Sequence, residues 1–376
     1  MTKNRLRCWW PLTALLSLLL GVGGFKVRAH ETDNFSLPLD VELADLGNYL
    51  DAVHTRALEI AVARVNADVE SAIKLRDEVI RTNRLRRLHD PLVLVKAFHD
   101  QFGYPMLEDS RLESALSGSW ARASFVGRET AHNDLSMNFS AYATLDPRRW
   151  MMLTQSRTIK AFGFYFGTDK LVHFHNIGEA YYRTYRELRD TGLSREAAYQ
   201  RVIQLYKDEG LLSEKGMLGT LTTGVFSNGD LAANHAGFKF YENLTEKIVL
   251  QGQECEPLVV RSGVFWRLNR HVRPRSGWLK VFISDHWNEA LNPNLYTPSM
   301  RAGIRQALEE RAETIVQFYT QKDARPNDAT YFDELARQLA TYHGEDYGHS
   351  GQFEDLITIG NTCFPAIQVG PAGSTK

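Results

Sequence analysis

The feature that most constrains the fold is a long run of apolar residues at helical spacing between Asp40 and Arg84. Aliphatic side chains recur there at the period of one face of an α-helix, which differs from the alternation of a strand. The run comprises Leu43, Leu46, Leu50, Val53, Leu58, Ile60, Val62, Val65, Val69, Ile73, Leu75, Val79 and Ile80. It predicts one very long amphipathic helix, or the same helix broken once.

Helical patterns dominate the rest of the chain as well. Asp90 and Pro91 supply an N-cap and a first turn for a helix that we expect to end at Gly103. Further helices are expected over residues 169–190, 191–210, 231–244, 297–321 and 329–343. The runs KIVL, PLVVR and LKVFI predict a minor β element around 246–283. Because strands and helices do not alternate, we predict a mainly α fold, a helical bundle with long amphipathic N-terminal helices.

Residues 1–29 have the composition of a secretory signal peptide. MTKNRLRCWW is basic, PLTALLSLLLGVGGF is apolar and KVRA ends in small residues, so cleavage is expected after Ala29. The alternative is an uncleaved membrane anchor. We therefore expect a secreted or periplasmic protein with one mostly helical domain, residues 30–365. Its long-helix part spans 30–103, its main body 104–365, and a loose tail follows over 366–376.

Charge limits the partners of the expected mature chain. The net charge is −1, and residues 1–29 hold five basic residues and no acid, so their removal leaves a net charge of about −6. Nucleic acid is therefore not expected as a partner, because its binding depends on many basic residues. The basic cluster RTNRLRR, residues 81–87, is either a solvated helix face or a lipid-headgroup patch for peripheral membrane contact.

Two cysteines, Cys255 and Cys363, follow the expected cleavage site. An even pair in an exported chain favours a disulfide, here one that closes a long loop. The alternative is two isolated thiols.

The stretch GTDKLVHFHNIGEAYYRTY is rich in titratable side chains on an expected helix. At about 100° per residue, Asp169, His173 and Asn176 share one stripe. Asp169 would orient His173 as a metal ligand or general base, and Asn176 would hold a substrate oxygen or a water. His175 and Glu179 lie one turn apart on the flank of this stripe. The alternative is a buried hydrogen-bond network that fixes the position of the helix.

Within that stretch, DKLVHF resembles the D-K-x-x-H-F signature of the VanZ-like proteins. Those are membrane proteins with several spans, and the resemblance covers six residues. It puts Asp169, Lys170 and His173 forward as a functional unit, with Lys170 as a substrate-binding residue.

The second stretch, FSNGDLAANHAGFKFYENL, places Asp230 and Asn234 on one face of a helix start. Asp230 and His235, which directly follows Asn234, are candidate metal ligands, and His235 is a candidate catalytic residue. Asn228 and Asn234 are candidate substrate-binding residues near free backbone N–H groups. The alternative is simple N-capping by the residues at the turn. The Gly- and Thr-rich segment before it suggests a mobile lid or close backbone approach.

In the third stretch, ISDHWNEALNPNLY, Asp285 and Glu289 are four residues apart. Asp285 is a candidate metal ligand, and Trp287 is a candidate pocket wall that contacts substrate. N-capping is again the alternative.

These clusters support two expectations of function. The first is a hydrolase of an envelope or extracellular ester or phosphoester, with a His/Asp acid–base site or a divalent metal, zinc above all. It requires the three stretches to meet, including His173 and His235. The second is a non-catalytic envelope-associated binding protein for a lipid, glycan or protein partner. The motifs GxSxG, HExxH, GxGxxG and the P-loop are absent from the sequence, which disfavours the common hydrolase and nucleotide-binding types.

Overall fold

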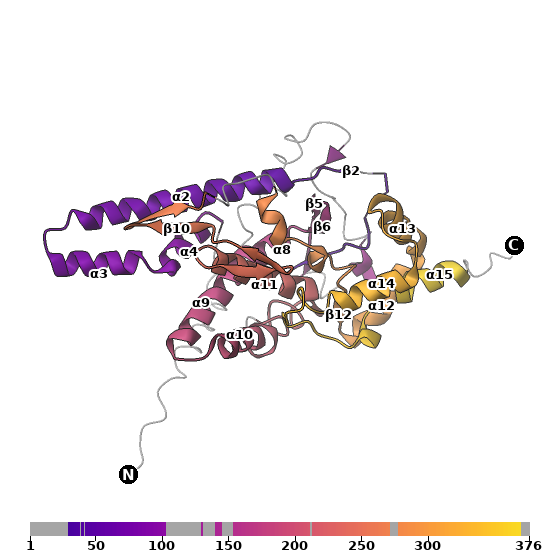
Figure 1. The fold of residues 1–376 in the computed structure, drawn as a ribbon. Helices are drawn as coiled ribbons and strands as arrows, with labels where there is room; N and C mark the ends of the chain where they lie inside the picture. The colour runs from indigo at the N-terminus through magenta and orange to yellow at the C-terminus, as the bar shows by residue number, and fades with distance from the viewer. Residues whose placement is uncertain are drawn as a thin grey trace, which may run out of the picture.

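The structure, a computed structural model, describes residues 29–37, 39–40, 42–102, 129–130, 140–144, 153–210, 213–270 and 277–369. Helices make up most of this part of the chain, and its short strands pair two by two (Figure 1). The prediction of a mainly α fold is confirmed. Among these residues no helix has the length and apolar character needed to cross a membrane. The expected signal peptide, apart from Ala29, lies outside them.

The predicted long N-terminal helix is broken once. α2 spans Gly47–Ile73 and α3 spans Glu78–Leu88, and the Asp77 side chain caps α3 by accepting from the backbone N–H of Ile80. The two helices form a hairpin that projects from the body on the left of Figure 1. α4, Pro91–His99, returns toward the body with Asp90 as its N-cap, as predicted, and it ends before Gly103.

A second long helix carries the first predicted stretch. It consists of α8 (Asp169–Val172), a π-helical turn η3 (His173–Ile177) and α9 (Gly178–Asp190). It packs against α11, Asn228–Asn243, most closely at Gly178, where an added methyl group would lie 2.6 Å from the Cα of Gly237. Between them in sequence come α10 (Arg195–Gln204) and a π-helical turn η4 (Leu205–Glu209).

The C-terminal part is a set of shorter helices. They are α12 (Pro298–Glu310), α13 (Ala312–Gln317), η7 (Phe318–Lys322), α14 (Ala329–Gln338), η8 (Phe353–Asp355), η9 (Ile359–Cys363) and α15 (Phe364–Val369). Because α15 continues to Val369, the expectation of a loose tail from residue 366 is wrong for its first residues. The remainder of that tail lies outside the described residues.

Within the part of the chain that the structure describes, the strands form six two-stranded pairs. Two pairs are parallel, β1 (Ala29–Thr32) with β4 (Leu153–Ser156) and β2 (Glu42–Leu43) with β3 (Glu129–Thr130). Four are antiparallel: β5 (Thr158–Ala161) with β6 (Phe164–Gly167), β7 (Val225–Phe226) with β12 (Leu295–Tyr296), β8 (Ile248–Leu250) with β9 (Gln253–Cys255), and β10 (Val259–Ser262) with β11 (Phe265–Leu268).

The minor β element predicted around 246–283 is therefore present as two hairpins, but its last run is not a strand. LKVFI falls in a 3₁₀ helix, η5, Trp278–Phe282. Gly277 precedes it with a φ of 92°, and the Asp51 carboxylate accepts hydrogen bonds from the backbone N–H groups of Gly277 and Leu279. These contacts favour a tight turn there over an extended strand.

The predicted disulfide is wrong, since both cysteines are free thiols. Cys255 is partly exposed in β9 and packs against the larger cluster of buried apolar residues, which includes residues of α2, α9 and α11. Cys363 is fully buried in the second cluster, formed by the C-terminal helices. The two side chains therefore belong to different parts of the core.

Candidate functional site

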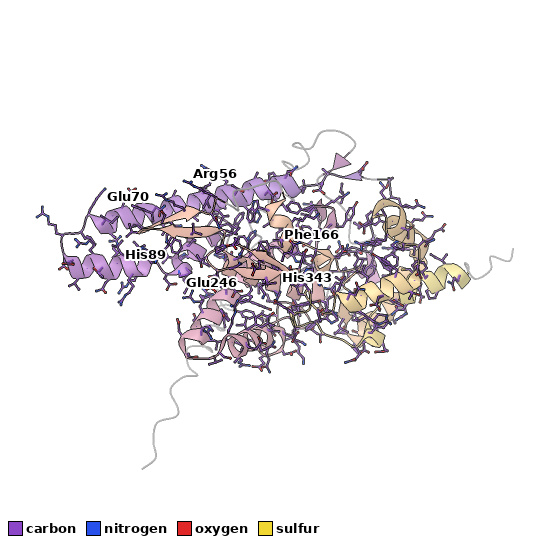
Figure 2. All side chains as sticks on the ribbon, viewed as in Figure 1. Arg56, Glu70, His89, Phe166, Glu246 and His343 are labelled. Carbon is purple, nitrogen blue, oxygen red and sulfur yellow. The ribbon has the colours of Figure 1, made fainter. Side chains whose placement is uncertain are left out.

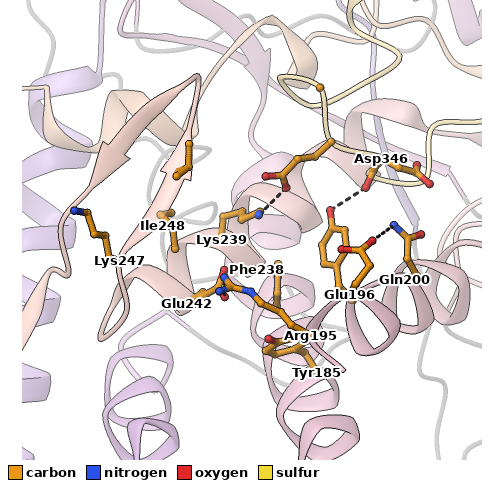
Figure 3. A pocket seen from close by; sticks show the side chains of 14 residues that line it. Tyr185, Arg195, Glu196, Gln200, Phe238, Lys239, Glu242, Lys247, Ile248 and Asp346 are labelled. Carbon is orange, nitrogen blue, oxygen red and sulfur yellow. Dashed lines mark hydrogen bonds and ion pairs between the residues drawn. The ribbon is translucent and has the colours of Figure 1, made fainter. Parts of the chain in front are cut away.

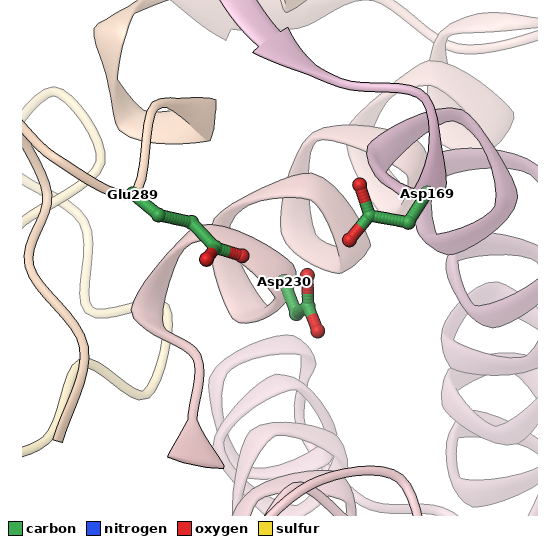
Figure 4. Close-up of side chains that lie close together, drawn as sticks. All are labelled: Asp169, Asp230 and Glu289. Atoms are coloured by element: carbon green, nitrogen blue, oxygen red, sulfur yellow. The ribbon is translucent and has the colours of Figure 1, made fainter. Parts of the chain in front are cut away.

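Lys170 lies at the centre of a buried group of carboxylates. Its side chain has no exposed surface, and its Nζ contacts Asp169 Oδ2 at 2.8 Å, Asp230 Oδ1 at 2.5 Å and Glu289 Oε1. Figure 4 shows these three carboxylates pointing toward one another from α8, from α11 and from the segment after η6 (Asp285–Trp287). Together with Glu31, Glu214 and His173 they form what we call the Lys170 cluster.

Local structure explains how the acids reach the lysine. Asp169 and Asp230 each lie in the first turn of a helix, where the helix dipole stabilises negative charge. Ser227 caps α11, and its hydroxyl also donates to Glu289 Oε1 at 3.1 Å. A Cβ on Gly229 would lie 3.1 Å from Lys170 Cε and 3.3 Å from Glu289 Cγ. Glycine at this position therefore leaves room for the lysine stem.

Residues at the end of β1 and just after it complete the wall of the cluster. Thr32 Oγ1 donates to Asp169 Oδ1 at 2.7 Å, and Asn34 Oδ1 accepts from the backbone N–H of Glu289 at 2.9 Å. The other Glu289 oxygen accepts from Asn294 Nδ2 at 2.8 Å and from the Tyr142 hydroxyl at 3.3 Å. The segment right after the expected cleavage site is therefore part of the candidate site.

Glu31 and Glu214 add two more carboxyl groups, both fully buried. Glu31 Oε1 accepts from the Thr223 hydroxyl at 2.7 Å, and Glu214 Oε1 accepts from the backbone N–H of Ser227 at 2.8 Å. The second oxygen of each has no hydrogen-bond partner within the described residues. Burial raises the pKa of both well above the ordinary value, with Glu289 adding to the shift of Glu31 and Asp230 to that of Glu214.

The pKa values of Lys170, Asp169 and Glu289 shift in different directions. Burial alone would lower the pKa of Lys170, but the carboxylates of Asp169, Asp230 and Glu289 outweigh it and hold this pKa well above its usual range. Burial would raise the pKa of Asp169, yet the Lys170 ammonium beside it lowers it. For Glu289 burial wins over Lys170, and its pKa rises to about 7. One lysine thus keeps Asp169 ionised while other carboxyls of the cluster favour the protonated form.

His173 links the cluster to the surface. Its side chain is 12% exposed, while the carboxylate side chain of Asp230 beside it is 1% exposed. Its Nε2 lies 3.2 Å from Asp230 Oδ2, and its Nδ1 lies 3.0 Å from Asn234 Oδ1. Asp230 and Asn234 are one turn apart on α11, as the sequence indicated, so one helix face holds both sides of the imidazole ring.

Asn176 does not join Asp169 and His173. Its Oδ1 lies 3.2 Å from His99 Nε2. The expected stripe assumed a regular α-helix, but the turn from His173 to Ile177 is π-helical and holds an extra residue, which changes the direction of the side chains that follow.

The second histidine of the stretch, His175, is in the core. Its Nε2 lies 3.1 Å from His54 Nε2, and its ring stacks on Phe102. Burial lowers the pKa of both histidines, that of His54 to about 4. Glu179 contacts Arg183 at 3.8 Å instead of forming the expected pair with His175.

His235 belongs to a different polar group. It follows Asn234, so its side chain leaves α11 about 100° further round, where it contacts the Tyr199 hydroxyl and Glu345 Oε2, the latter at 3.3 Å. Glu345 also pairs with Lys239 at 2.6 Å. Tyr199, Lys239 and Glu345 line a cavity of about 650 Å³ (Figure 3). The structure gives His173 and His235 separate sets of partners.

Three other predicted residues lie away from the lysine. Asp285 pairs with Arg325 at 2.7 Å. Trp287 is fully buried against Phe166, with ring centroids 5.1 Å apart, and is part of the core. Asn228 donates to the backbone carbonyls of residues 293 and 350 and so connects two loops.

Sequence reasoning missed Glu31 and Glu214 and chose Asp285 where the structure brings in Glu289. The spacing of Asp285 and Glu289 was the only signal for the latter. Glu31 and Glu214 each come from a short polar segment without a periodic pattern, so only the fold brings them to the lysine.

A metal site at the cluster would use oxygen ligands. Asp169, Asp230 and Glu289 each offer an oxygen, all within 4.8 Å of one another. Carboxylate oxygens suit Mg²⁺, Mn²⁺ or Ca²⁺, whereas zinc prefers nitrogen and sulfur. The expectation of zinc rested on His173 and His235 sharing a site. The Lys170 ammonium contacts all three oxygens, so a cation would have to compete with it.

Comparison of the chain with protein-family models, with curated proteins and with solved structures finds no match.

Proposed function

We propose that this chain is an exported acid–base hydrolase of an ester or phosphoester and that the Lys170 cluster is its site, with His173 but without His235, which the expectation from the sequence had included. The observation that carries the proposal is the contact chain from His173 through Asp230 to Lys170 and Glu289. A partly exposed imidazole thus meets a buried group of carboxyls in which the pKa of Asp169 is lowered and that of Glu289 is raised. Such separation of acid strengths is characteristic of acid–base catalytic sites.

The proposed step uses the His173 ring as the proton carrier. Asp230 accepts from Nε2–H and fixes the tautomer. Nδ1 faces Asn234 Oδ1 in the structure, and its lone pair becomes the base once a water takes the place of that oxygen. That water gives its proton to Nδ1 while its oxygen bonds to the carbonyl carbon or phosphorus. The proton then passes from Nδ1 to the oxygen of the leaving alcohol as the bond between that oxygen and the carbonyl carbon or phosphorus breaks. Asp230, which contacts both Lys170 and His173, lies where it can stabilise the imidazolium.

The test is hydrolysis of p-nitrophenyl acetate and bis-p-nitrophenyl phosphate by purified protein. We expect turnover that falls by about 10²–10⁴-fold in His173→Ala and falls also in Asp230→Asn. His343→Ala is the matched control, because His343 is exposed and lies outside the cluster. Absence of turnover on both substrates, or turnover that survives in His173→Ala, would refute the proposal.

A divalent cation held by Asp169, Asp230 and Glu289 is the metal-assisted form of the same proposal. It would polarise the substrate or activate a water. Elemental analysis of protein purified without chelator separates the two forms. A stoichiometric metal in the wild type supports the metal-assisted form. Metal binding that appears only in Lys170→Met would instead show that the ammonium takes the place of a cation.

The alternative is a non-catalytic envelope-associated protein that binds a lipid, glycan or protein. The observation that favours it is the enclosure of the cluster, in which both His173 nitrogens already face oxygens of α11. In that reading the cluster holds α8, α11 and the N-terminal segment together.

We also propose that the fold is a helical bundle with amphipathic N-terminal helices, which the buried stripe of α2 supports.

A further inference from the structure

The end of the α2–α3 hairpin combines exposed apolar side chains with a high positive charge. We call residues 73–87 the arm tip. It holds three exposed apolar residues, Ile73, Val79 and Ile80, which are 41%, 70% and 56% exposed. It also holds six basic residues and two acids, so its net charge is +4 in a chain whose net charge is −1. The basic residues are Lys74, Arg76, Arg81, Arg84, Arg86 and Arg87.

The apolar and basic side chains share one outward face. Ile80, Arg84 and Arg87 are spaced by four and three residues on α3, which places them on one stripe, and all three are exposed. Leu85 and Leu88 of the same helix are partly buried. Within the described residues, none of the six basic side chains forms an ion pair. An apolar centre flanked by unneutralised arginines remains available to a partner.

The base of the hairpin is fixed while the tip extends beyond it. The β10–β11 hairpin lies along α2, where the Asn66 side chain bonds the backbone N–H and carbonyl of Trp266. At the end of α3, Trp266 Nε1 donates to the Leu88 carbonyl at 3.0 Å, and His89 Nε2 lies 3.0 Å from the Val264 carbonyl. Figure 2 places Glu70 and His89 on the two sides of the projecting hairpin, away from the body. The tip is thus held out on a rigid support.

From this combination we infer that the arm tip docks on an anionic lipid bilayer. Ile73, Val79 and Ile80 enter the headgroup region, and the arginines and lysine contact the lipid phosphates. This is the behaviour of interfacial helices, whose apolar insertion and basic charge act together, each basic residue near an anionic surface contributing about 1 kcal/mol. The exposed apolar side chains, which can enter a bilayer, distinguish this surface from a nucleic-acid-binding patch, which needs positive charge alone. The inference does not depend on the proposed hydrolase.

The test is co-sedimentation of the purified protein with vesicles of phosphatidylglycerol and phosphatidylethanolamine, beside vesicles of phosphatidylcholine alone. We expect binding to the anionic vesicles only. Arg87→Glu should weaken it by about fivefold or more, from the value per charge given above, and the double variant Val79→Ser/Ile80→Ser should abolish stable binding. Lys215→Glu and Leu221→Ser are matched controls, since both residues are exposed elsewhere, Leu221 to 73%, and both variants should bind like the wild type.

Four results would overturn the inference. The first three are no binding to anionic vesicles, equal binding to both vesicle types, and binding that the arm-tip variants leave unchanged. The fourth is tight, Arg87-dependent binding of a DNA or RNA duplex by a protein that does not bind the vesicles. Sedimentation velocity completes the test, because a dimer that Val79→Ser/Ile80→Ser dissociates would identify a second copy of the chain as the occupant. Circular dichroism of each variant verifies that the helices are intact.

Discussion

The Lys170 cluster and the arm tip both contain many charged groups, but those of the cluster interact with one another and those of the arm tip face solvent. In the cluster, five carboxyl groups surround one ammonium with almost no access to water, so each charge depends on its neighbours. In the arm tip, water and salt screen eight charged residues, and none of its cations pairs with an acid within the described residues. Similar local sequences, rich in charge beside aliphatic residues, therefore produce a rigid internal network in one place and a contact surface in the other.

The largest difference should appear when one lysine is removed from each region. Lys170→Met leaves three buried carboxylates without their cation and should lower the free energy of unfolding by about 3–5 kcal/mol at pH 8. Lys74→Met, at the exposed arm tip, should change it by no more than about 0.5 kcal/mol. Urea denaturation at pH 8 measures both. Equal effects would mean that the cluster is better solvated than its burial indicates.

Acid should reduce the cost of losing Lys170. Protonation of Glu289, whose pKa is raised to about 7, removes one of the charges that the ammonium neutralises, so the difference between wild type and Lys170→Met should shrink between pH 8 and pH 5. Denaturation curves at both values test this. A difference that does not change with pH would show that lost packing, not charge, dominates.

Removing an unpaired acid from the cluster should stabilise the protein. Because the pKa of Glu31 is raised in the folded state, its stabilising contribution is complete below its unfolded pKa and is lost as pH rises through the folded pKa. Glu31→Gln keeps an acceptor for Thr223 but does not ionise. We expect a gain of about 1–3 kcal/mol at pH 8, the range for an unsatisfied buried group, and no gain at pH 5. Glu354→Gln, at an exposed acid, is the control.

The smallest expected effect is that of salt on the stability of the Lys170 cluster. The Debye length falls from about 10 Å at 0.1 M to about 3 Å at 1 M, and buried pairs are screened much less than exposed ones. The stability difference caused by Lys170→Met should therefore change little over this range. Binding of the arm tip to anionic vesicles should weaken strongly. Salt sensitivity of the first difference, measured by denaturation, would contradict the separation of the two regions.

The sequence predicted the helices better than it predicted the site. Asp90 with Pro91 marked the start of α4, and the apolar run from residue 40 indicated one long helix or the same helix broken once, because capping and periodicity act over a few residues. The same reasoning failed for Asn176 and His175, since a π-helical turn altered their direction. It failed for LKVFI as well, where Asp51, more than two hundred residues away, holds the backbone in a turn.

What the sequence determined by itself was local. Apolar spacing and caps specified where helices form, and the spacing of Asp230 and Asn234 specified that the two side chains share one face of a helix. Only the tertiary structure decided which charges share a space. Glu31, Glu214 and Glu289 come from three distant segments, and the close approach of α9 and α11 at Gly178 and Gly237 brings two of the helices concerned together. The energy of a buried charge depends on neighbours within a few ångströms in space, and spacing along the chain carries no information about neighbours that a distant segment supplies.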